Sequence, residues 1–182
     1  MPPLRPLGKR FKGKRAGTYL RRPASGRIRA GAALCAGDPI MANAKAPDDL
    51  AALFEAALRA RDHAHAPYSR FPVGAAVRSA SGAIFAGCNV ENAAYPSGIC
   101  AETAAIAAMV CAGEREISAI LVLGQTDEPL TPCGACRQRI LEFATPHTLI
   151  HCGSAAGPGV ARTMDELLPH AFGPDRLSKG AP

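Results

Sequence analysis

Between residues 47 and 69 the apolar positions recur with the spacing of an amphipathic helix. They share one helical face and comprise Leu50, Leu53, Phe54, Ala57 and Leu58. Asp48 or Asp49 is suited to cap the N-terminus of this helix. The sequence Ala66-Pro67-Tyr68-Ser69 ends it, because a proline disfavours helical geometry in the residue before it.

Four later runs have the pattern of β-strands. Residues 73–78 and 84–90 are short runs joined through Ser81-Gly82, which predicts a hairpin. Residues 117–123 form a continuous apolar run with β-branched side chains, typical of an interior strand that is covered on both faces. Residues 148–152 predict another strand.

Helical patterns separate these strands. Residues 101–112 are rich in alanine and apolar nearly all round, which predicts a buried helix. Residues 134–143 predict a second short helix, and residues 164–168 a last helical turn. Strands that alternate with helices favour one α/β domain with helices on both faces of a mixed sheet.

Composition narrows the class of protein. The chain has 182 residues, of which 48% are hydrophobic, enough for one domain with its own core. No apolar run approaches the ~20 residues that span a bilayer, which excludes an integral membrane protein. Because a convincing secretory signal is also absent, we expect a cytoplasmic protein.

The positive charge is concentrated in the first part of the chain. The net charge is +6, but residues 1–40 carry ten Lys and Arg against one acid, a net of +9. Residues 41–182 hold 11 basic and 14 acidic side chains, a net of −3. We therefore expect a disordered basic N-terminal extension over residues 1–42 and a catalytic domain over residues 43–182.

Several interpretations of this extension stay open. An organellar transit peptide would be rich in Arg and poor in acids, as here, but also amphipathic. A basic arm that binds nucleic acid would be expected to interleave aromatic residues, and only Phe11 and Tyr19 are present. The third interpretation is that Met41 is the native start and the preceding residues are translated upstream sequence.

The cysteines indicate a metal site. Seven cysteines, an odd number, without a secretory signal disfavour a disulfide framework. Cys133 and Cys136 are spaced so that both thiolates reach one tetrahedral ion, and Cys100 offers a third ligand. Three protein ligands leave a fourth position for water, the arrangement of catalytic zinc sites, so we expect one Zn²⁺ per subunit.

Glu102 makes the prediction of a catalytic zinc site more specific. It follows Cys100 by two residues, where its carboxylate can exchange protons with water without being a metal ligand. Cys-Ala-Glu followed by Pro-Cys-x-x-Cys is the established signature of zinc deaminases, with Cys in the first ligand position. Three of the other cysteines are predicted to pack in the core, namely Cys88, Cys111 and Cys152, whereas Cys35 lies in the extension.

From Leu50 to Leu177 the sequence resembles the small homotetrameric zinc-dependent cytidine deaminases. The resemblance rests on segments in the expected order, namely residues 68–76, 87–96, 98–102, 131–138 and 167–174. It implies a three-layer α/β/α domain with a central mixed sheet of about five strands. It also assigns the three cysteines as zinc ligands and Glu102 as the catalytic residue.

The resemblance implies roles in substrate binding for further residues. Asn89 and Glu91 would hydrogen-bond the ribose hydroxyls, and their spacing of two would place both on one face of a strand. Phe71 would stack on the pyrimidine, and the backbone of Ala101 would hold the edge of the base.

Assembly and charge balance are two further implications. Tyr95 and Phe172 resemble aromatic residues that complete the site of a neighbouring subunit in a homotetramer. Many relatives carry Arg directly after the catalytic Glu, where this chain has Thr103. We expect the negative charge of the thiolates to be offset instead by helix N-termini and one hydrogen bond from Thr103.

The implied reaction is hydrolytic loss of the 4-amino group from cytidine or deoxycytidine, in pyrimidine salvage. Glu102 would protonate N3 and then carry a proton to the departing amine, yielding ammonia and uridine or deoxyuridine. One alternative is another aminated pyrimidine nucleoside, such as a blasticidin-like antibiotic. Others are nucleic-acid editing, which the charge of −3 on residues 41–182 disfavours, and a zinc module without activity.

Overall fold

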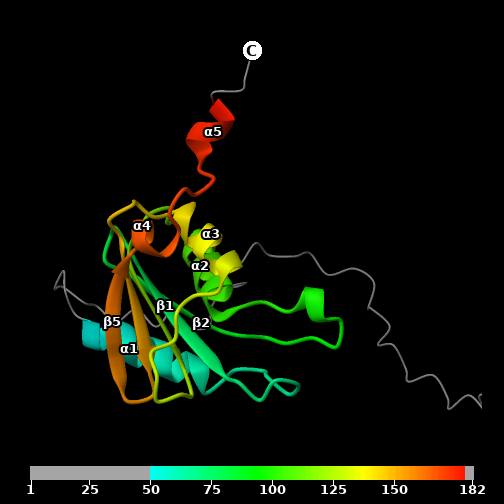
Figure 1. The fold of residues 1–182 in the computed structure, drawn as a ribbon. Helices are drawn as coiled ribbons and strands as arrows, with labels where there is room; N and C mark the ends of the chain where they lie inside the picture. The colour runs from blue at the N-terminus through cyan, green and yellow to red at the C-terminus, as the bar shows by residue number, and fades with distance from the viewer. Residues whose placement is uncertain (1–49, 179–182) are drawn as a thin grey trace, which may run out of the picture. The chain divides into compact units, whose positions relative to one another are not determined.

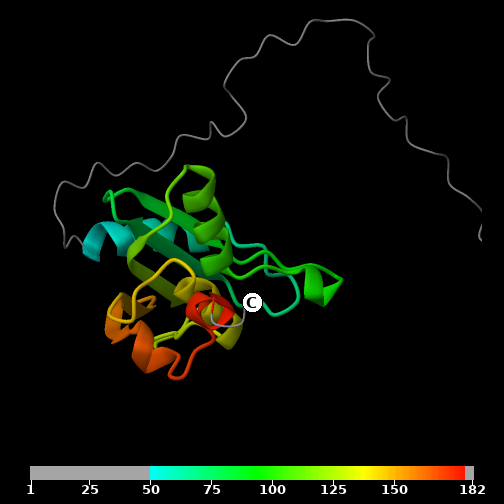
Figure 2. The same cartoon turned by 90° about the horizontal axis from the view of Figure 1, so that it is seen from above.

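Five strands form one mixed sheet, and helices cover both of its faces (Figures 1 and 2). The computed structural model describes residues 50–178. The elements follow in the order α1 (Leu50–Arg61), β1 (Val73–Ser79), β2 (Ile84–Cys88), η1 (Tyr95–Ser97), α2 (Ala101–Cys111), β3 (Ile117–Gly124), α3 (Gly134–Leu141), β4 (Leu149–Ser154), β5 (Gly157–Thr163), α4 (Met164–Leu167) and α5 (Pro174–Ser178).

The apolar run of β3 occupies the middle of the sheet. The strand order is β2-β1-β3-β4-β5, with β3 antiparallel to β1 and parallel to β4. Residues 120–124 are all buried, because the strand has a neighbour on each side and helices on both faces. The prediction of an interior strand is therefore confirmed.

The sheet separates two apolar clusters. On one face α1 contributes Leu53 and Ala57, which pack with Ala76 of β1. On the other face α2 and α3 pack against Ala75, the strand residue that points the opposite way. The two clusters confirm the predicted three-layer α/β/α arrangement around a five-stranded mixed sheet.

One strand and one helix face differ from the sequence prediction. The resemblance implied about five strands, but the apolar pattern did not locate β5, because its sequence GPGVART lacks alternation and it lies at the edge of the sheet. The prediction that α2 is buried all round is wrong: Ala107, Ala108 and Cys111 are exposed. Only one face of α2 packs on the sheet, and the small alanines are apolar without being buried.

The remaining cysteines and two element ends also differ in part from the sequence prediction. Core packing is confirmed for Cys152, is only partial for Cys88, and is wrong for Cys111. The strand predicted over residues 84–90 ends at Cys88, and the helix predicted over residues 134–143 ends at Leu141.

Some predictions lie outside the described residues. They concern the extension over residues 1–42, the domain boundary at residue 43, Cys35, and the capping role of Asp48 or Asp49. Within residues 50–178, no helix is long and apolar enough to cross a membrane.

Candidate active site

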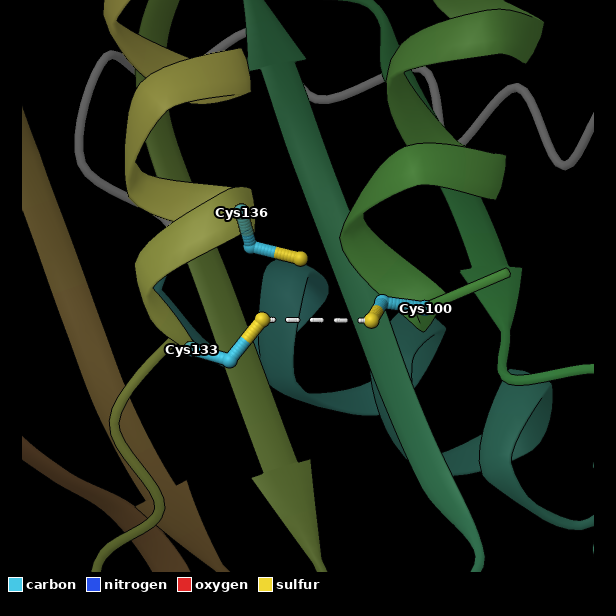
Figure 3. A group of neighbouring side chains, drawn as sticks. All are labelled: Cys100, Cys133 and Cys136. Atoms are coloured by element: carbon cyan, nitrogen blue, oxygen red, sulfur yellow. Dashed lines mark hydrogen bonds between the residues drawn. The ribbon is translucent and has the colours of Figure 1, made fainter. Parts of the chain in front are cut away.

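Two helix N-termini bring the three predicted metal ligands together. Cys100 is the N-cap residue of α2, and Cys133 is the N-cap residue of α3. Cys136 lies in the first turn of α3, three residues after Cys133, so the helical rise returns its side chain to the same side. Figure 3 shows the three side chains pointing toward one another from the two helices.

The spacing of the sulfur atoms fits a zinc ion. The Sγ atoms of Cys100 and Cys133 are 4.0 Å apart, and all three sulfurs lie within 4.8 Å of one another. A tetrahedral ion with zinc–sulfur bonds of about 2.3 Å requires sulfurs about 3.8 Å apart. Thiolate is also a preferred zinc ligand, so both the distances and the donor atoms suit this metal.

The environments of the three thiols differ. Cys136 is buried, and burial together with the charge of Glu102 raises its pKa strongly. Burial also raises the pKa of Cys100. The pKa of Cys133 is lowered, because the backbone N–H of Cys136 and the neighbouring thiols outweigh the opposite effect of burial. A cation among the sulfurs would offset the negative charge that the buried positions disfavour.

Glu102 lies in the first turn of α2 and is almost fully buried, with 4% of its surface exposed. Burial raises the pKa of its carboxyl group, because the charged form loses its hydration. Hydrogen bonding from its own backbone and from the Cys136 thiol, with the charge of Arg139, opposes this effect. A raised pKa brings a carboxyl group closer to the range in which one group can both accept and donate a proton during a reaction.

A cavity of about 610 Å³ opens in front of this cluster. Its lining includes eight of the ten residues predicted for the site: Phe71, Asn89, Glu91, Tyr95, Cys100, Ala101, Glu102 and Cys133. The two others are Cys136, which is fully buried, and Phe172. The fold thus brings residues separated by more than sixty positions in the sequence to one concave surface.

Asn89 and Glu91 lie beyond the end of β2 rather than within the strand as predicted. Asn89 Oδ1 accepts a hydrogen bond from the backbone N–H of Val73 at 2.8 Å, and Asn89 Nδ2 donates to the carbonyl of Phe71 at 3.0 Å. Glu91 Oε2 accepts from the backbone N–H groups of Tyr68 and Ser69 at 2.8 and 3.2 Å. Both side chains therefore line the cavity and bind the neighbouring loop.

The aromatic residues divide between the cavity and the outer surface. Tyr95 forms an edge-to-face contact with Tyr68, with ring centroids 6.0 Å apart, yet 76% of Tyr95 is exposed. Phe172 does not line the cavity of its own chain; it is 61% exposed, and its carbonyl accepts a hydrogen bond from Gln138.

Arg137 follows Cys136 in the sequence but binds backbone carbonyl groups, and the Thr103 hydroxyl group forms no hydrogen bond with another described residue. Arg137 donates from Nε to the carbonyl of Pro132 and from Nη1 to the carbonyl of Leu167, both at 2.9 Å. It therefore ties the chain next to Cys133 to the end of α4. Thr103 Oγ1 is buried and has no hydrogen-bond partner among the described residues, so the bond expected from it is not formed.

Sequence reasoning missed several residues of the cavity wall. They are Tyr68, Ser69, Val73, Val90, Asn92, Gly98, Ile99, Leu130, Thr131. Tyr68 and Ser69 fall within a segment that carries the family resemblance, which was the available signal. Leu130 and Thr131 precede Cys133 directly, so their closeness to a metal ligand was a second signal.

A family model describes this part of the chain. Residues 47–152 match the cytidine and deoxycytidylate deaminase zinc-binding region. The match includes all three cysteines and Glu102.

Curated relatives and solved structures agree with the family model. A cytidine deaminase from Sporosarcina psychrophila is 41% identical over 133 residues, which is 73% of this chain and 98% of the relative. One from Mycobacterium tuberculosis is 39% identical over 123 residues, 68% of this chain and 89% of the relative. The crystal structure of cytidine deaminase from Burkholderia pseudomallei superposes with a TM-score of 0.64 at 44% identity, covering 67% of this chain and 98% of that one.

Proposed function

This chain belongs to the cytidine deaminase family, and on that premise we propose that it converts cytidine and deoxycytidine to uridine and deoxyuridine by hydrolysis. The reaction adds one water and releases ammonia. We place it in pyrimidine salvage, in the cytoplasm.

One observation gives this proposal its strongest support. The buried carboxyl group of Glu102 lies beside three converging sulfurs, at the wall of a cavity large enough for a nucleoside. A structural zinc site normally has four protein ligands and needs no neighbouring acid. A three-sulfur site with an acid beside it fits hydrolysis instead.

Glu102 moves the protons of the reaction. Cys100, Cys133 and Cys136 would hold the zinc ion, which when bound supplies a Lewis acid that makes water nucleophilic near neutral pH. The Glu102 carboxylate accepts a proton from the attacking water and donates it to N3 of the base. It then transfers the second proton of that water to the 4-amino group, which leaves as ammonia.

The cavity wall orients the nucleoside. Phe71 provides an aromatic face for the pyrimidine, and the backbone of Ala101 at the start of α2 offers a polar edge to the base. Asn89 and Glu91 line the same cavity and present an amide and a carboxylate to the ribose hydroxyls.

The charge of the cavity supports a free nucleoside rather than a nucleotide. Of the described residues that line it, Glu91 and Glu102 are acidic, and neither Lys nor Arg is among them. A carboxylate repels a 5′-phosphate and the backbone of a polynucleotide. We therefore expect cytidine to be a far better substrate than its monophosphate or a single-stranded nucleic acid.

We also propose a homotetramer in which Tyr95 and Phe172 reach the cavity of a neighbouring subunit. Their exposed rings, and the position of Phe172 outside its own cavity, support this assembly. Light scattering after size-exclusion chromatography measures the mass directly, and a monomer would contradict the proposal.

Ammonia release from cytidine tests the function, with zinc content measured on the same preparation. We expect turnover and one zinc per chain for the full-length protein. Glu102→Gln should keep the zinc and lose at least about 10²-fold in kcat, because the proton carrier is gone. The matched control, Glu116→Gln, changes an exposed acid and should retain full activity.

Two results would overturn these assignments. A zinc-loaded protein that releases no ammonia from cytidine, but does so from a blasticidin-type antibiotic or single-stranded DNA, would exclude the proposed substrate. Unchanged turnover in Glu102→Gln would exclude the proposed role of that carboxyl group.

A further inference from the structure

The loop that joins α1 to β1 is attached along its length to residues 89–91. The backbone N–H of His65 donates to the carbonyl of Asn89 at 3.0 Å, and the N–H of Glu91 donates back to the carbonyl of His65 at 2.8 Å. Further along the loop, the N–H of Asn89 donates to the carbonyl of Val73 at 3.2 Å. Figures 1 and 2 show these two segments extending together beyond the edge of the sheet.

Between these backbone contacts two side chains bind the loop, in addition to its own bonds from the Arg70 N–H to the Ala66 carbonyl and from the Phe71 N–H to Ser69 Oγ, both at 3.0 Å. The amide of Asn89 binds the carbonyl of Phe71 and the N–H of Val73, on either side of one proline. The carboxylate of Glu91 receives the N–H groups of Tyr68 and Ser69. These four backbone groups lack a hydrogen-bond partner from a regular helix or strand, and the two side chains supply one.

The conformation of the loop also requires support. Arg70 has a positive φ of 55°, a left-handed conformation that is uncommon outside glycine and costs about 1 kcal/mol or more. It lies between the residues held by Glu91 and those held by Asn89. The two contacts therefore enclose the strained residue and define where the ring of Phe71 is presented.

We propose that Asn89 and Glu91 are positioning residues, which fix the loop over residues 66–72 and thereby the aromatic wall of the cavity. This second role is additional to contact with the ribose, and it rests on the proposed function only for its effect on turnover. These hydrogen bonds join protein atoms only, so we expect them to hold the wall whether or not a nucleoside is bound.

The atoms available allow both roles at once. The two backbone contacts of Glu91 use Oε2, and the Ser69 hydroxyl group also hydrogen-bonds this carboxylate. A carboxylate has about four lone-pair sites, so one is left for a ribose hydroxyl group. Asn89 uses one N–H of its amide and one lone pair of its oxygen, and each group has a second. One side of each side chain can therefore hold the loop while the other faces a hydroxyl group.

Hydrogen exchange measured by mass spectrometry on the full-length, zinc-loaded protein tests the proposal without a substrate. Asn89→Ala removes the acceptor of the Val73 N–H, and Glu91→Ala removes the acceptor of the Tyr68 and Ser69 N–H groups. We expect these amides to exchange at least about tenfold faster in the respective variants.

Two further variants make this measurement specific. Glu91→Gln keeps an amide oxygen that can accept the same N–H groups, so loop protection should return close to that of the natural chain. Ser81→Ala removes a hydroxyl group in the β1–β2 hairpin, which bonds Glu114 and not the loop. It should leave exchange of residues 66–73 unchanged.

Turnover of two substrates separates positioning from ribose contact. Cytidine carries 2′- and 3′-hydroxyl groups on its ribose, whereas 2′,3′-dideoxycytidine lacks both. If Glu91→Ala and Asn89→Ala disturb the aromatic wall, kcat/KM should fall by about tenfold or more on both substrates. Side chains that contact only the hydroxyls would lower kcat/KM on cytidine and leave dideoxycytidine unchanged.

The outcomes distinguish this inference from the proposed function. Unchanged loop exchange in both alanine variants, with losses confined to cytidine, overturns the positioning role while the deaminase assignment stands. Faster exchange in a protein that does not deaminate cytidine supports the positioning of the loop and overturns the proposed reaction.

Discussion

Gly87 of β2 lies where the first turns of α2 cross the sheet, and we expect Gly87→Ala to displace the start of that helix. An added Cβ would lie 2.8 Å from the carbonyl oxygen of Ala101 and 2.7 Å from Cβ of Ala104, and would also meet the backbone nitrogen of Ala105. Two of these atoms belong to the backbone of α2, and a backbone atom cannot move without the rest of its helix. The helix must therefore shift as a unit.

The contact to Ala101 sets a lower limit on the shift. Ordinary contact of a Cβ begins at 3.4 Å, so relieving the 2.8 Å contact alone moves the helix by about 0.6 Å, and the closer contacts to Ala104 and Ala105 require more. Cys100 and Glu102 at the start of α2 move with it. Catalytic groups must be held within about 0.5 Å of their productive geometry, so we expect kcat to fall roughly tenfold. Overpacking should also lower the free energy of unfolding by ~1–3 kcal/mol.

Three measurements on one preparation check this prediction: kcat and KM for cytidine, zinc per chain, and the midpoint of thermal unfolding. Gly157→Ala is the matched control, because a Cβ at that position has nothing within 4 Å. It lies in β5, away from the cavity, and should leave all three quantities unchanged. A Gly87→Ala protein with the kcat and unfolding midpoint of the natural chain would refute the reasoning.

Three further variants probe single contacts. Thr103→Val removes a buried hydroxyl group that has no hydrogen-bond partner among residues 50–178, so thermal unfolding should show about 1 kcal/mol of added stability. A loss of stability would mean that this hydroxyl group has a hydrogen-bond partner in the zinc-loaded protein. Arg137→Gln breaks the hydrogen bonds to the Pro132 and Leu167 carbonyls, which hold the chain next to Cys133. Zinc should therefore transfer faster to a chromogenic chelator, and an unchanged transfer rate would contradict this role of Arg137. Burial lowers the pKa of His151 below its ordinary 6.5, so its contribution to stability is complete above about pH 6.5 and is lost as the pH falls. His151→Gln should therefore flatten the decline of the unfolding midpoint between about pH 7 and 5. Parallel pH profiles of the variant and the natural chain would exclude this role.

Residues close together in the sequence could be interpreted without the fold. The spacing of Cys133 and Cys136 places two thiols on one helical turn, and Glu102 follows Cys100 within another. The apolar run of β3 likewise predicted a strand covered on both faces, since burial on both faces removes the need for alternation. Periodicity failed for α2, because alanine is apolar whether or not it is buried.

Only the tertiary structure decided which distant segments meet. The approach of Cys100 to Cys133 depends on the order of the strands and on how α2 and α3 pack, which no local pattern encodes. The same holds for the contacts of Glu91 with the loop at Tyr68 and for those of Arg137. Helical and strand periods report which side of an element is buried, whereas the partner that buries it is set by packing between elements far apart in the chain. The sequence by itself therefore determined the layers and the chemistry of the ligands, and the fold determined the cavity in which they act.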